Sequence, residues 1–408
     1  RILRPDKPMP TLQLRILAVE PSNVYHTDLE VLQGISLAPS DHRPEAIRQK
    51  HEVAFNVERV TKEFFKTYKE ILNQLKAKLI VQGKGNEDQA HGFAQQLLNR
   101  LMFLYFLQKK GWLKWGDGTP DKRYMRTLWQ KYAATKPLDK SFYHSWLFSL
   151  FFYAFNNRTS LLPSELPGDI RASFLNMPFL NGGLFAESDL DRLGFDVPHE
   201  IFITLFDRNI DGTSPGFLER YNFTIQESLP LEVEVAVDPE MLGRVYESLI
   251  NEEDRHQAGI FYTPRIEIDY MCRLSLIEYL HETTSFSKDV LIPVVMAPAS
   301  DDGQSELSKL GNEEFNKLRT ALDSVKVVDP AVGSGSFLVG MMNVLVQLYR
   351  AIAECQGHHE NEFALKKRII SQNLYGVDVK DWAVRVCELR LWLSLIIESE
   401  ESQMDIYG

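Results

Sequence analysis

A β-branched run, a glycine-rich turn and a long apolar helix follow one another without interruption between residues 325 and 354. Residues 325–328 predict a short strand, and residues 329–336, Asp-Pro-Ala-Val-Gly-Ser-Gly-Ser, predict a tight turn. A helix is expected from Phe337 to about Glu354. A strand that passes through such a turn directly into a helix is the start of an α/β crossover, and this restricts the fold more than any other feature of the chain.

A second strand follows the crossover and ends in an acidic residue. Residues 360–371 predict a helix, residues 374–377 predict a strand, and Asp378 comes directly after it. Residues 382–395 are amphipathic and predict one more helix. Together these segments form half of a doubly wound sheet of the kind that binds nucleotides.

The turn and the acid indicate which ligand such a sheet would bind. Ligands lie at the carboxyl ends of parallel strands, where Gly333 and Gly335 allow a close backbone approach and Asp378 is placed to accept hydrogen bonds from ribose hydroxyls. A dinucleotide fingerprint does not fit because Leu338 stands at its third glycine, and no P-loop run occurs. S-adenosylmethionine, an adenosine with an amino-acid tail, fits better. The alternative is a glycine turn with a purely structural role.

The region upstream of the sheet carries helical periodicity. Apolar residues recur at helical spacing through residues 57–79. Residues 91–110 and 142–155 are apolar on nearly every side, which is typical of buried helices. Residues 157–222 are rich in Gly, Pro, Asn and Asp and predict loops and short helices.

Shorter signals flank these segments. Alternating apolar residues predict a short strand at residues 12–16, and further helices are expected at residues 239–249 and 266–281. Residues 296–316 have the composition of a polar surface excursion.

Charge is divided unevenly along the chain. The net charge is −11, yet residues 51–140 hold 17 basic and 9 acidic side chains, whereas residues 141–408 hold 21 and 41. The basic segment either faces a polyanion or forms the solvated face of an amphipathic helix, and we favour the second interpretation because helix faces are charged as a rule. The acidic remainder would repel DNA, so this chain alone is not expected to bind DNA tightly.

The cysteines and the apolar segments bear on the cellular setting. Cys272, Cys355 and Cys387 are too few for a disulfide framework and lack the spacing of metal ligands, which favours a reducing, cytoplasmic setting without a metal site. The longest apolar stretch, near residues 142–155, is shorter than the roughly 18 residues that span a bilayer. The chain begins Arg-Ile-Leu-Arg-Pro, and we expect it to be a piece of a larger protein.

Three motifs in this order resemble a known family. Residues 329–338, Asp-Pro-Ala-Val-Gly-Ser-Gly-Ser-Phe-Leu, resemble the cofactor motif of gamma-class DNA adenine-N6 methyltransferases, as found in type I and type IIG restriction-modification enzymes. Residues 259–265, Gly-Ile-Phe-Tyr-Thr-Pro-Arg, are similar to the motif that precedes the sheet in that class. Residues 374–378 and 389–393 are similar to its second motif. The resemblance covers residues 50–408.

This resemblance implies an α/β plus all-α protein. Residues 51–250 would form a helical domain, and residues 251–408 the first part of a Rossmann-like, S-adenosylmethionine-dependent methyltransferase sheet. Residues 1–50 would be a linker with short strands that follows an upstream domain, such as a nuclease. A nuclease of this kind needs Mg²⁺ held by clustered carboxylates, and residues 1–50 hold no convincing set, so Mg²⁺ is expected only outside this chain.

The resemblance also assigns cofactor-binding residues. Tyr262 and Thr263 would contact the methionine end of the cofactor, although Tyr262 is also consistent with a core tyrosine. Asp329 would hold the amino group, Asp378 would bind the ribose hydroxyls, and Val379 would pack on the adenine. The expected site comprises Tyr262, Thr263, Asp329, Pro330, Ala331, Gly333, Ser334, Gly335, Ser336, Phe337, Asp378 and Val379.

The reaction centre of that family is absent from the sequence. It is an Asn/Asp/Ser-Pro-Pro-aromatic motif that accepts hydrogen bonds from the target amino group and stacks on a flipped base. No Pro-Pro dipeptide occurs in the 408 residues, and the nearest likeness, residues 176–179, lies far upstream and lacks the second proline. No catalytic residue is therefore assigned, and we expect the chain to be inactive alone.

Two functions follow from these patterns. The favoured one is part of an S-adenosylmethionine-dependent DNA adenine-N6 methyltransferase in a restriction-modification or phage-defence enzyme, alone or fused to an endonuclease. Its partner in the full-length enzyme would be double-stranded DNA with a flipped adenine, and no membrane partner is expected. The alternative is a helical DNA- or protein-docking scaffold with a vestigial methyltransferase half. Methylation of a small molecule or a protein is less favoured because of the long helical region.

Overall fold

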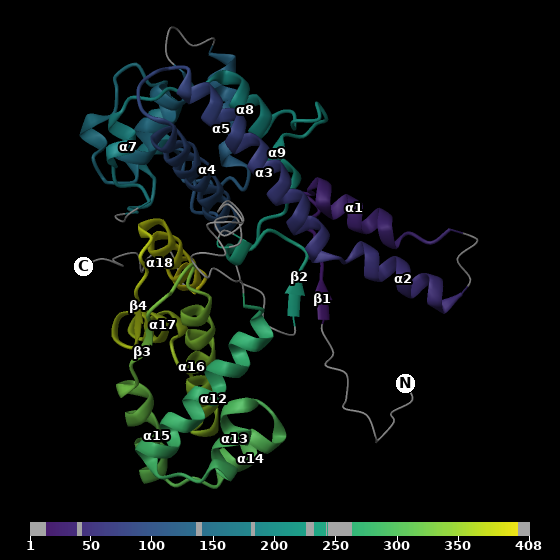
Figure 1. Ribbon diagram of the computed structural model, residues 1–408, viewed down its shortest axis with the longest axis vertical. Helices are drawn as coiled ribbons and strands as arrows, with labels where there is room; N and C mark the ends of the chain where they lie inside the picture. The colour runs from purple at the N-terminus through teal and green to yellow at the C-terminus, as the bar shows by residue number, and fades with distance from the viewer. Residues whose placement is uncertain are drawn as a thin grey trace. The chain divides into compact units, whose positions relative to one another are not determined.

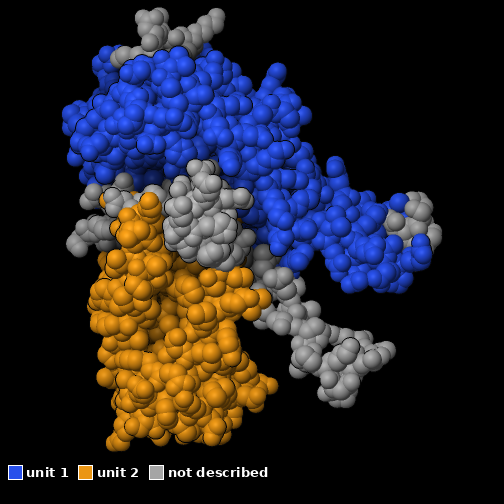
Figure 2. Space-filling model, viewed as in Figure 1, with its two compact units in different colours: residues 1–238, 403–408 blue, residues 239–402 orange. Residues whose placement is uncertain are grey.

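Helices dominate the structure, a computed structural model that describes residues 14–38, 43–135, 141–180, 184–225, 232–241, 243 and 263–398. The chain divides into two compact units, one within residues 1–238 and the other within residues 239–402 (Figure 2). In the described residues each unit holds one pair of short parallel strands (Figure 1). The helix-rich part of the predicted architecture is thus confirmed, whereas the predicted domain boundary at residues 250–251 lies outside the described residues.

The first unit is a bundle of helices with one strand pair. β1 runs parallel to β2, with Leu14 opposite Glu232, and the sequence patterns predict β1 but not β2. The described elements are β1 (Leu14–Ile16), α1 (His26–Ile35), α2 (Pro44–Ala54), α3 (Val57–Ile80), α4 (Glu87–Lys110), α5 (Tyr124–Ala134), η1 (Tyr143–Leu147), η2 (Leu150–Ala154), η3 (Thr159–Leu161), α6 (Gly168–Leu175), α7 (Asp189–Arg192), α8 (His199–Phe206), α9 (Phe217–Arg220) and β2 (Glu232–Glu234).

Two long helices, α3 and α4, form the centre of the first unit, and their ends are set by local side chains. The Asn56 side chain accepts the Arg59 N–H at the start of α3, and Asn86 does the same for Gln89 at the start of α4. α4 ends at Gly111, whose φ of 83° is the left-handed conformation that glycine adopts readily. α4 is buried on nearly every side over its second half, as its apolar sequence predicts.

The lysines of α3 lie on the solvated face of this helix. Lys62, Lys66 and Lys69 are exposed. The Lys76 ammonium lies 2.6 Å from Glu87, and that of Lys78 lies 3.6 Å from Glu200. Because acidic side chains neutralise part of this charge, the structure favours a solvated helix face over a surface built for a polyanion.

Residues 142–155 are mostly buried, as predicted, but they do not form one regular α-helix. η1 and η2 are two turns of π-helix, in which the backbone N–H bonds to the carbonyl five residues earlier, as Phe155 does to Leu150 at 3.1 Å. Periodicity in so short an apolar segment does not separate this wider turn from an α-helix.

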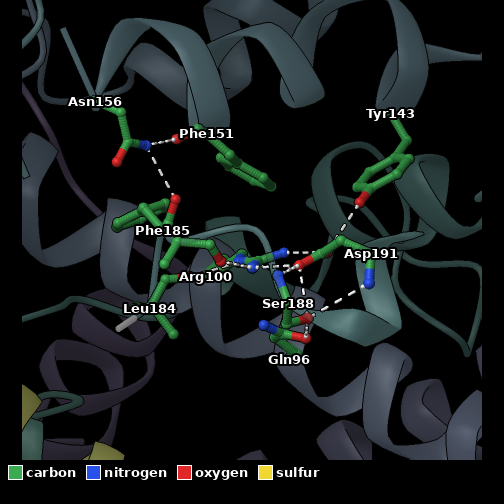
Figure 3. A network of polar contacts seen from close by, with 10 residues as sticks. Gln96, Arg100, Tyr143, Phe151, Asn156, Leu184, Phe185, Ser188 and Asp191 are labelled. Carbon is green, nitrogen blue, oxygen red and sulfur yellow. Dashed lines mark hydrogen bonds and ion pairs between the residues drawn. The ribbon is translucent and has the colours of Figure 1, made fainter. Parts of the chain in front are cut away.

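A buried arginine crosslinks the first unit. The Arg100 guanidinium on α4 binds Asp191 on α7 through two hydrogen bonds of 2.6 and 2.9 Å, and both side chains are almost fully buried (Figure 3). Arg100 also donates to the carbonyls of Leu184 and Ala186. Burial would raise the pKa of Asp191, but the hydrogen bonds and charge of Arg100 outweigh it and hold this pKa below its ordinary value. This network ties the irregular chain around residues 184–191 to the central helix.

We predict that Arg100→Met lowers the free energy of unfolding by about 3–5 kcal/mol, because it leaves the Asp191 carboxylate buried without its cation. Arg192→Met is the matched control, since Arg192 pairs with Asp189 at an exposed position. That control should change the free energy by less than about 1 kcal/mol. Urea unfolding followed by circular dichroism measures both, and equal losses would show that the buried network does not stabilise the unit.

The second unit is built around one helix, α16. β3 and β4 pair in parallel, with Val327 opposite Leu374 and Asp329 opposite Gly376, and α16 and α17 form the crossover between them. The wider Rossmann-like sheet stays a prediction. The elements are α12 (Arg265–Thr284), α13 (Lys288–Met296), α14 (Asp301–Ser308), α15 (Asn312–Ser324), β3 (Val327–Asp329), α16 (Ser336–Cys355), α17 (Glu362–Gln372), β4 (Leu374–Gly376) and α18 (Asp381–Ile396).

The core of the second unit includes a segment that the sequence patterns assign to the surface. The expected surface excursion at residues 296–316 is wrong, because it contains α14 and the start of α15 and contributes Leu307 and Phe315 to the core. On another side of α16, Gly340 permits the close approach of Ile268 on α12, since a Cβ at Gly340 would lie 2.6 Å from the Ile268 side chain. The apolar surface of α16 is therefore covered by helices on more than one side.

α16 is also, among the described residues, a helix long and apolar enough to cross a membrane by length and composition alone. Two-thirds of its most apolar window is buried inside the unit. We therefore interpret α16 as a core helix.

Candidate functional site

The turn between β3 and α16 is held by hydrogen bonds within its own chain. Asp329 ends β3, and its carboxylate accepts the Ala331 N–H at 3.1 Å. The Val332 carbonyl accepts the Gly335 N–H at 2.8 Å, after which α16 begins at Ser336. The turn therefore has a defined conformation that leads directly from the strand into the helix.

A second set of hydrogen bonds joins the turn to the segment after β4. The Asp378 carboxylate accepts the Gly333 N–H at 2.9 Å through one oxygen and the Lys380 N–H at 2.9 Å through the other. The Val332 N–H donates to the Val377 carbonyl at 2.9 Å. Two backbone N–H groups thus orient the half-buried Asp378 side chain toward the turn, at the carboxyl ends of both strands.

The two glycines of the turn have different surroundings. Both have positive φ, 50° for Gly333 and 88° for Gly335, which disfavours other residues. A Cβ on Gly335 would lie 2.6 Å from the Cys387 sulfur on α18, whereas a Cβ on Gly333 would meet nothing within 4 Å. One side of the turn is therefore packed against α18, and the side at Gly333 is open.

A buried thiol lies beside the start of α16. The Cys272 sulfur on α12 donates a weak hydrogen bond to the Phe337 carbonyl at 3.7 Å. Burial, with a smaller contribution from Asp269, raises the pKa of Cys272 to about 12. Cys272 is therefore a neutral packing residue and not a nucleophile at neutral pH.

Arg390 contacts the turn, although the sequence patterns do not assign it to the site. Its guanidinium projects from α18 and donates to the Ser334 carbonyl at 2.8 Å and to the Ser336 hydroxyl at 3.0 Å. A charged residue within the amphipathic pattern of residues 382–395 is the signal that would have pointed to it. Its position under the turn is visible only in the tertiary structure.

The structure brings most of the residues that the sequence assigns to the cofactor together at one place. Asp329 to Phe337 and Asp378 meet at the strand ends, as the hydrogen bonds above show. Val379 follows directly but is 94% exposed, and its packing on an adenine stays a prediction. Thr263 lies just before α12, and its contact with a ligand also stays a prediction. Tyr262 lies outside the described residues.

Comparison with known proteins identifies relatives of this chain. Residues 305–405, which include the turn and Asp378, match the family described as "MmeI, DNA-methyltransferase domain". A protein of Methanocaldococcus jannaschii described as a type II restriction enzyme and methyltransferase is 33% identical over 312 residues, which are 74% of this chain and 25% of the relative. DNA methyltransferase A of Bacillus subtilis is 22% identical over 244 residues, 59% of this chain and 22% of the relative.

A third relative and one solved structure complete the comparison. The adenine-specific methyltransferase PglX of Lacticaseibacillus casei is 30% identical over 99 residues, 24% of this chain and 7% of the relative. The structure of the type IIL restriction-modification enzyme MmeI in complex with DNA gives a TM-score of 0.43 at 18% identity, over 81% of this chain and 36% of that one. This likeness is too low to define the fold.

The chain spans a quarter or less of the length of these curated relatives. The matches confirm the resemblance to DNA methyltransferases of restriction-modification enzymes.

Alanine substitutions of the two glycines of the turn are predicted to destabilise the protein to different extents. Gly333→Ala should lower the free energy of unfolding by about 1–2 kcal/mol, the cost of a left-handed alanine. Gly335→Ala should lower it by about 1–3 kcal/mol more, because its Cβ also overlaps Cys387. Denaturant unfolding of the two variants measures the difference. Equal losses would contradict the close packing of the turn on α18.

Proposed function

We propose that this chain, a relative of the DNA methyltransferases of restriction-modification type, is the cofactor-binding part of an S-adenosylmethionine-dependent DNA adenine-N6 methyltransferase. The observation that carries the proposal is the Asp378 carboxylate, which accepts the Gly333 N–H at the ends of β3 and β4. It lies inside the segment that matches the DNA-methyltransferase domain of MmeI. An acid, a glycine turn and a helix start at the ends of parallel strands are the groups that bind an adenosine ligand.

The residues at the turn fit this cofactor. Each oxygen of Asp378 accepts one backbone N–H and keeps a lone pair for a ribose hydroxyl. The space at Gly333 lets a ligand approach the backbone. The first turn of α16 has no side-chain cap, so its N–H groups suit the carboxylate of an amino-acid tail. Asp329, at the end of β3, would hold the amino group of that tail.

The bound cofactor supplies a methyl group carried on a sulfonium. In this proposal the chain's own residues contribute binding and orientation: Asp378 fixes the sugar, and the turn fixes the amino-acid end. Such positioning can remove a large part of the activation barrier when a bound nucleophile attacks a bound methyl group. Since no Pro-Pro dipeptide occurs among the 408 residues, we assign base recognition to other parts of the whole protein.

The target base and the restriction-modification role are proposed from the descriptions of the relatives. One relative is named an adenine-specific methyltransferase, which supports adenine as the target. Another is described as a restriction enzyme as well as a methyltransferase, which supports a restriction-modification role. Double-stranded DNA as the partner is part of the same proposal. A type IIG-like arrangement, a role in phage defence and a cytoplasmic setting belong to the same proposal.

Calorimetry and methyl transfer test the proposal on the intact protein. We expect S-adenosylmethionine and its demethylated product to bind, and a labelled methyl group to appear on adenine N6 of duplex DNA. Binding without transfer would limit the proposal to the cofactor site. If neither ligand binds, the proposal is rejected in favour of the helical DNA- or protein-docking scaffold with a vestigial methyltransferase half.

Asp378→Ala tests the role of the acid. We predict that it weakens S-adenosylmethionine binding by about 1.5–3 kcal/mol, the scale of hydrogen bonds to a charged group. Asp302→Ala, at an exposed position on α14, is the control and should leave the affinity unchanged. The dissociation constants come from calorimetry, and circular dichroism checks the fold. A folded Asp378→Ala protein with the wild-type dissociation constant would remove this residue from the site.

A further inference from the structure

Arg390 is buried directly under the turn that leads into α16. It is 2% exposed and projects from α18, whose buried residues are mainly apolar. Its Nη1 atom donates to the Ser334 carbonyl at 2.8 Å and to the Ser336 hydroxyl at 3.0 Å, with the Ser334 hydroxyl at 3.2 Å. One nitrogen of the guanidinium thus binds both the residue before Gly335 and the residue after it.

These contacts fix the orientation of a single peptide group. The Ser334 carbonyl is held by Arg390, and the N–H of the same peptide, on Gly335, donates to the Val332 carbonyl at 2.8 Å. Both polar groups of the peptide are therefore bound. Gly335, with φ of 88°, then turns the chain into α16. Loss of Arg390 would remove a charged hydrogen bond from the carbonyl end of this peptide.

The turn has a packed side and an open side, and Arg390 lies on the packed side. Cys387 of the same helix packs against Gly335, and Gly243 covers Ser334 so closely that a Cβ on Gly243 would overlap its side chain. The open side carries Gly333, with space above it, and the Gly333 N–H points to Asp378. Arg390 could therefore affect a ligand on the open side only through the backbone of the turn.

The positive charge of Arg390 does not favour the start of α16. Ser336 is the first residue of this helix, so the guanidinium lies near its amino end. The amino end of a helix carries a partial positive charge, so a cation there is unfavourable, whereas an acid or a hydroxyl would be favourable. The Nη1 atom contacts the carbonyl and hydroxyl groups of Ser334 and Ser336, where a cationic donor is favourable.

From this geometry we infer that Arg390 is a positioning residue: it holds the Ser334–Gly335 peptide in the orientation in which the open side of the turn receives S-adenosylmethionine. The identity of that ligand rests on the proposed function. Arg390 itself does not touch the ligand, and its effect on binding passes through the turn.

A second buried arginine of the same unit provides the control. Arg273 on α12 is 7% exposed and donates to Asp269 at 2.8 Å, to the Val295 carbonyl at 2.6 Å and to Gln347 at 2.7 Å. It makes a comparable set of hydrogen bonds with none to the turn. Arg273→Met should therefore lower the melting temperature as Arg390→Met does, without the same effect on the turn.

The experiment measures the turn with and without ligand in the intact protein. Hydrogen–deuterium exchange of a peptide covering residues 330–338 should be faster in Arg390→Met than in the wild type, and unchanged in Arg273→Met. Calorimetry should show S-adenosylmethionine bound about tenfold more weakly by Arg390→Met, the effect expected if the released turn adopts the binding conformation only about one tenth of the time. Arg273→Met should keep the wild-type dissociation constant. Arg390→Lys should be intermediate in both measurements, since the lysine side chain is one atom shorter and its ammonium falls short of the position of Arg390 Nη1.

The outcomes separate this inference from the proposed function. Unchanged exchange in residues 330–338 of a folded Arg390→Met protein overturns the positioning role, as does an equal increase in Arg273→Met. If Arg390→Met does not fold, wild-type exchange and affinity in Arg390→Lys overturn it instead. If the wild type binds neither S-adenosylmethionine nor its product while exchange rises as expected, the proposed function fails and the hold of Arg390 on the turn stands.

Discussion

The second unit depends on one turn that is held from two sides. On one side the Asp378 carboxylate accepts the N–H of Gly333, 45 residues away in the chain, and so joins the ends of the two strands. On the other, the Arg390 guanidinium donates to Ser334 and Ser336. Because α16 starts within this turn and forms the centre of the core, the conformation of the turn sets the direction in which the helix enters the unit.

Both units use a buried arginine to hold irregular backbone. In the first unit Arg100 binds the carbonyls of Leu184 and Ala186 and the Asp191 carboxylate. In the second, Arg390 binds the turn. Carbonyls outside helices and sheets still need partners when they are buried, and a guanidinium supplies five donors in a fixed plane. The first arrangement stabilises a fold, whereas the second lies under a site with an open side.

Sequence patterns predicted elements well where one periodicity covers a long segment. The helix expected from Phe337 to Glu354 is α16, Ser336–Cys355, and the strand expected before Asp378 is β4, Leu374–Gly376. They failed at residues 296–316, because abundant polar residues conceal two apolar side chains that fill the core. They also missed β2, since three residues of mixed polarity carry no strand signal without the partner that pairs with them.

The sequence by itself determined the local chemistry of the candidate site: a glycine turn after a strand, an acid after the next strand, and a resemblance to methyltransferases that the relatives confirm. Only the tertiary structure decided which groups meet there. It directs Asp378 to the Gly333 N–H, packs Cys387 against Gly335 and places Arg390 under Ser334. The physical reason is that periodicity and residue type report on neighbours within a few turns of chain. Contacts between residues about 50 positions apart depend instead on how α16 and α18 pack in three dimensions, and no local pattern encodes this.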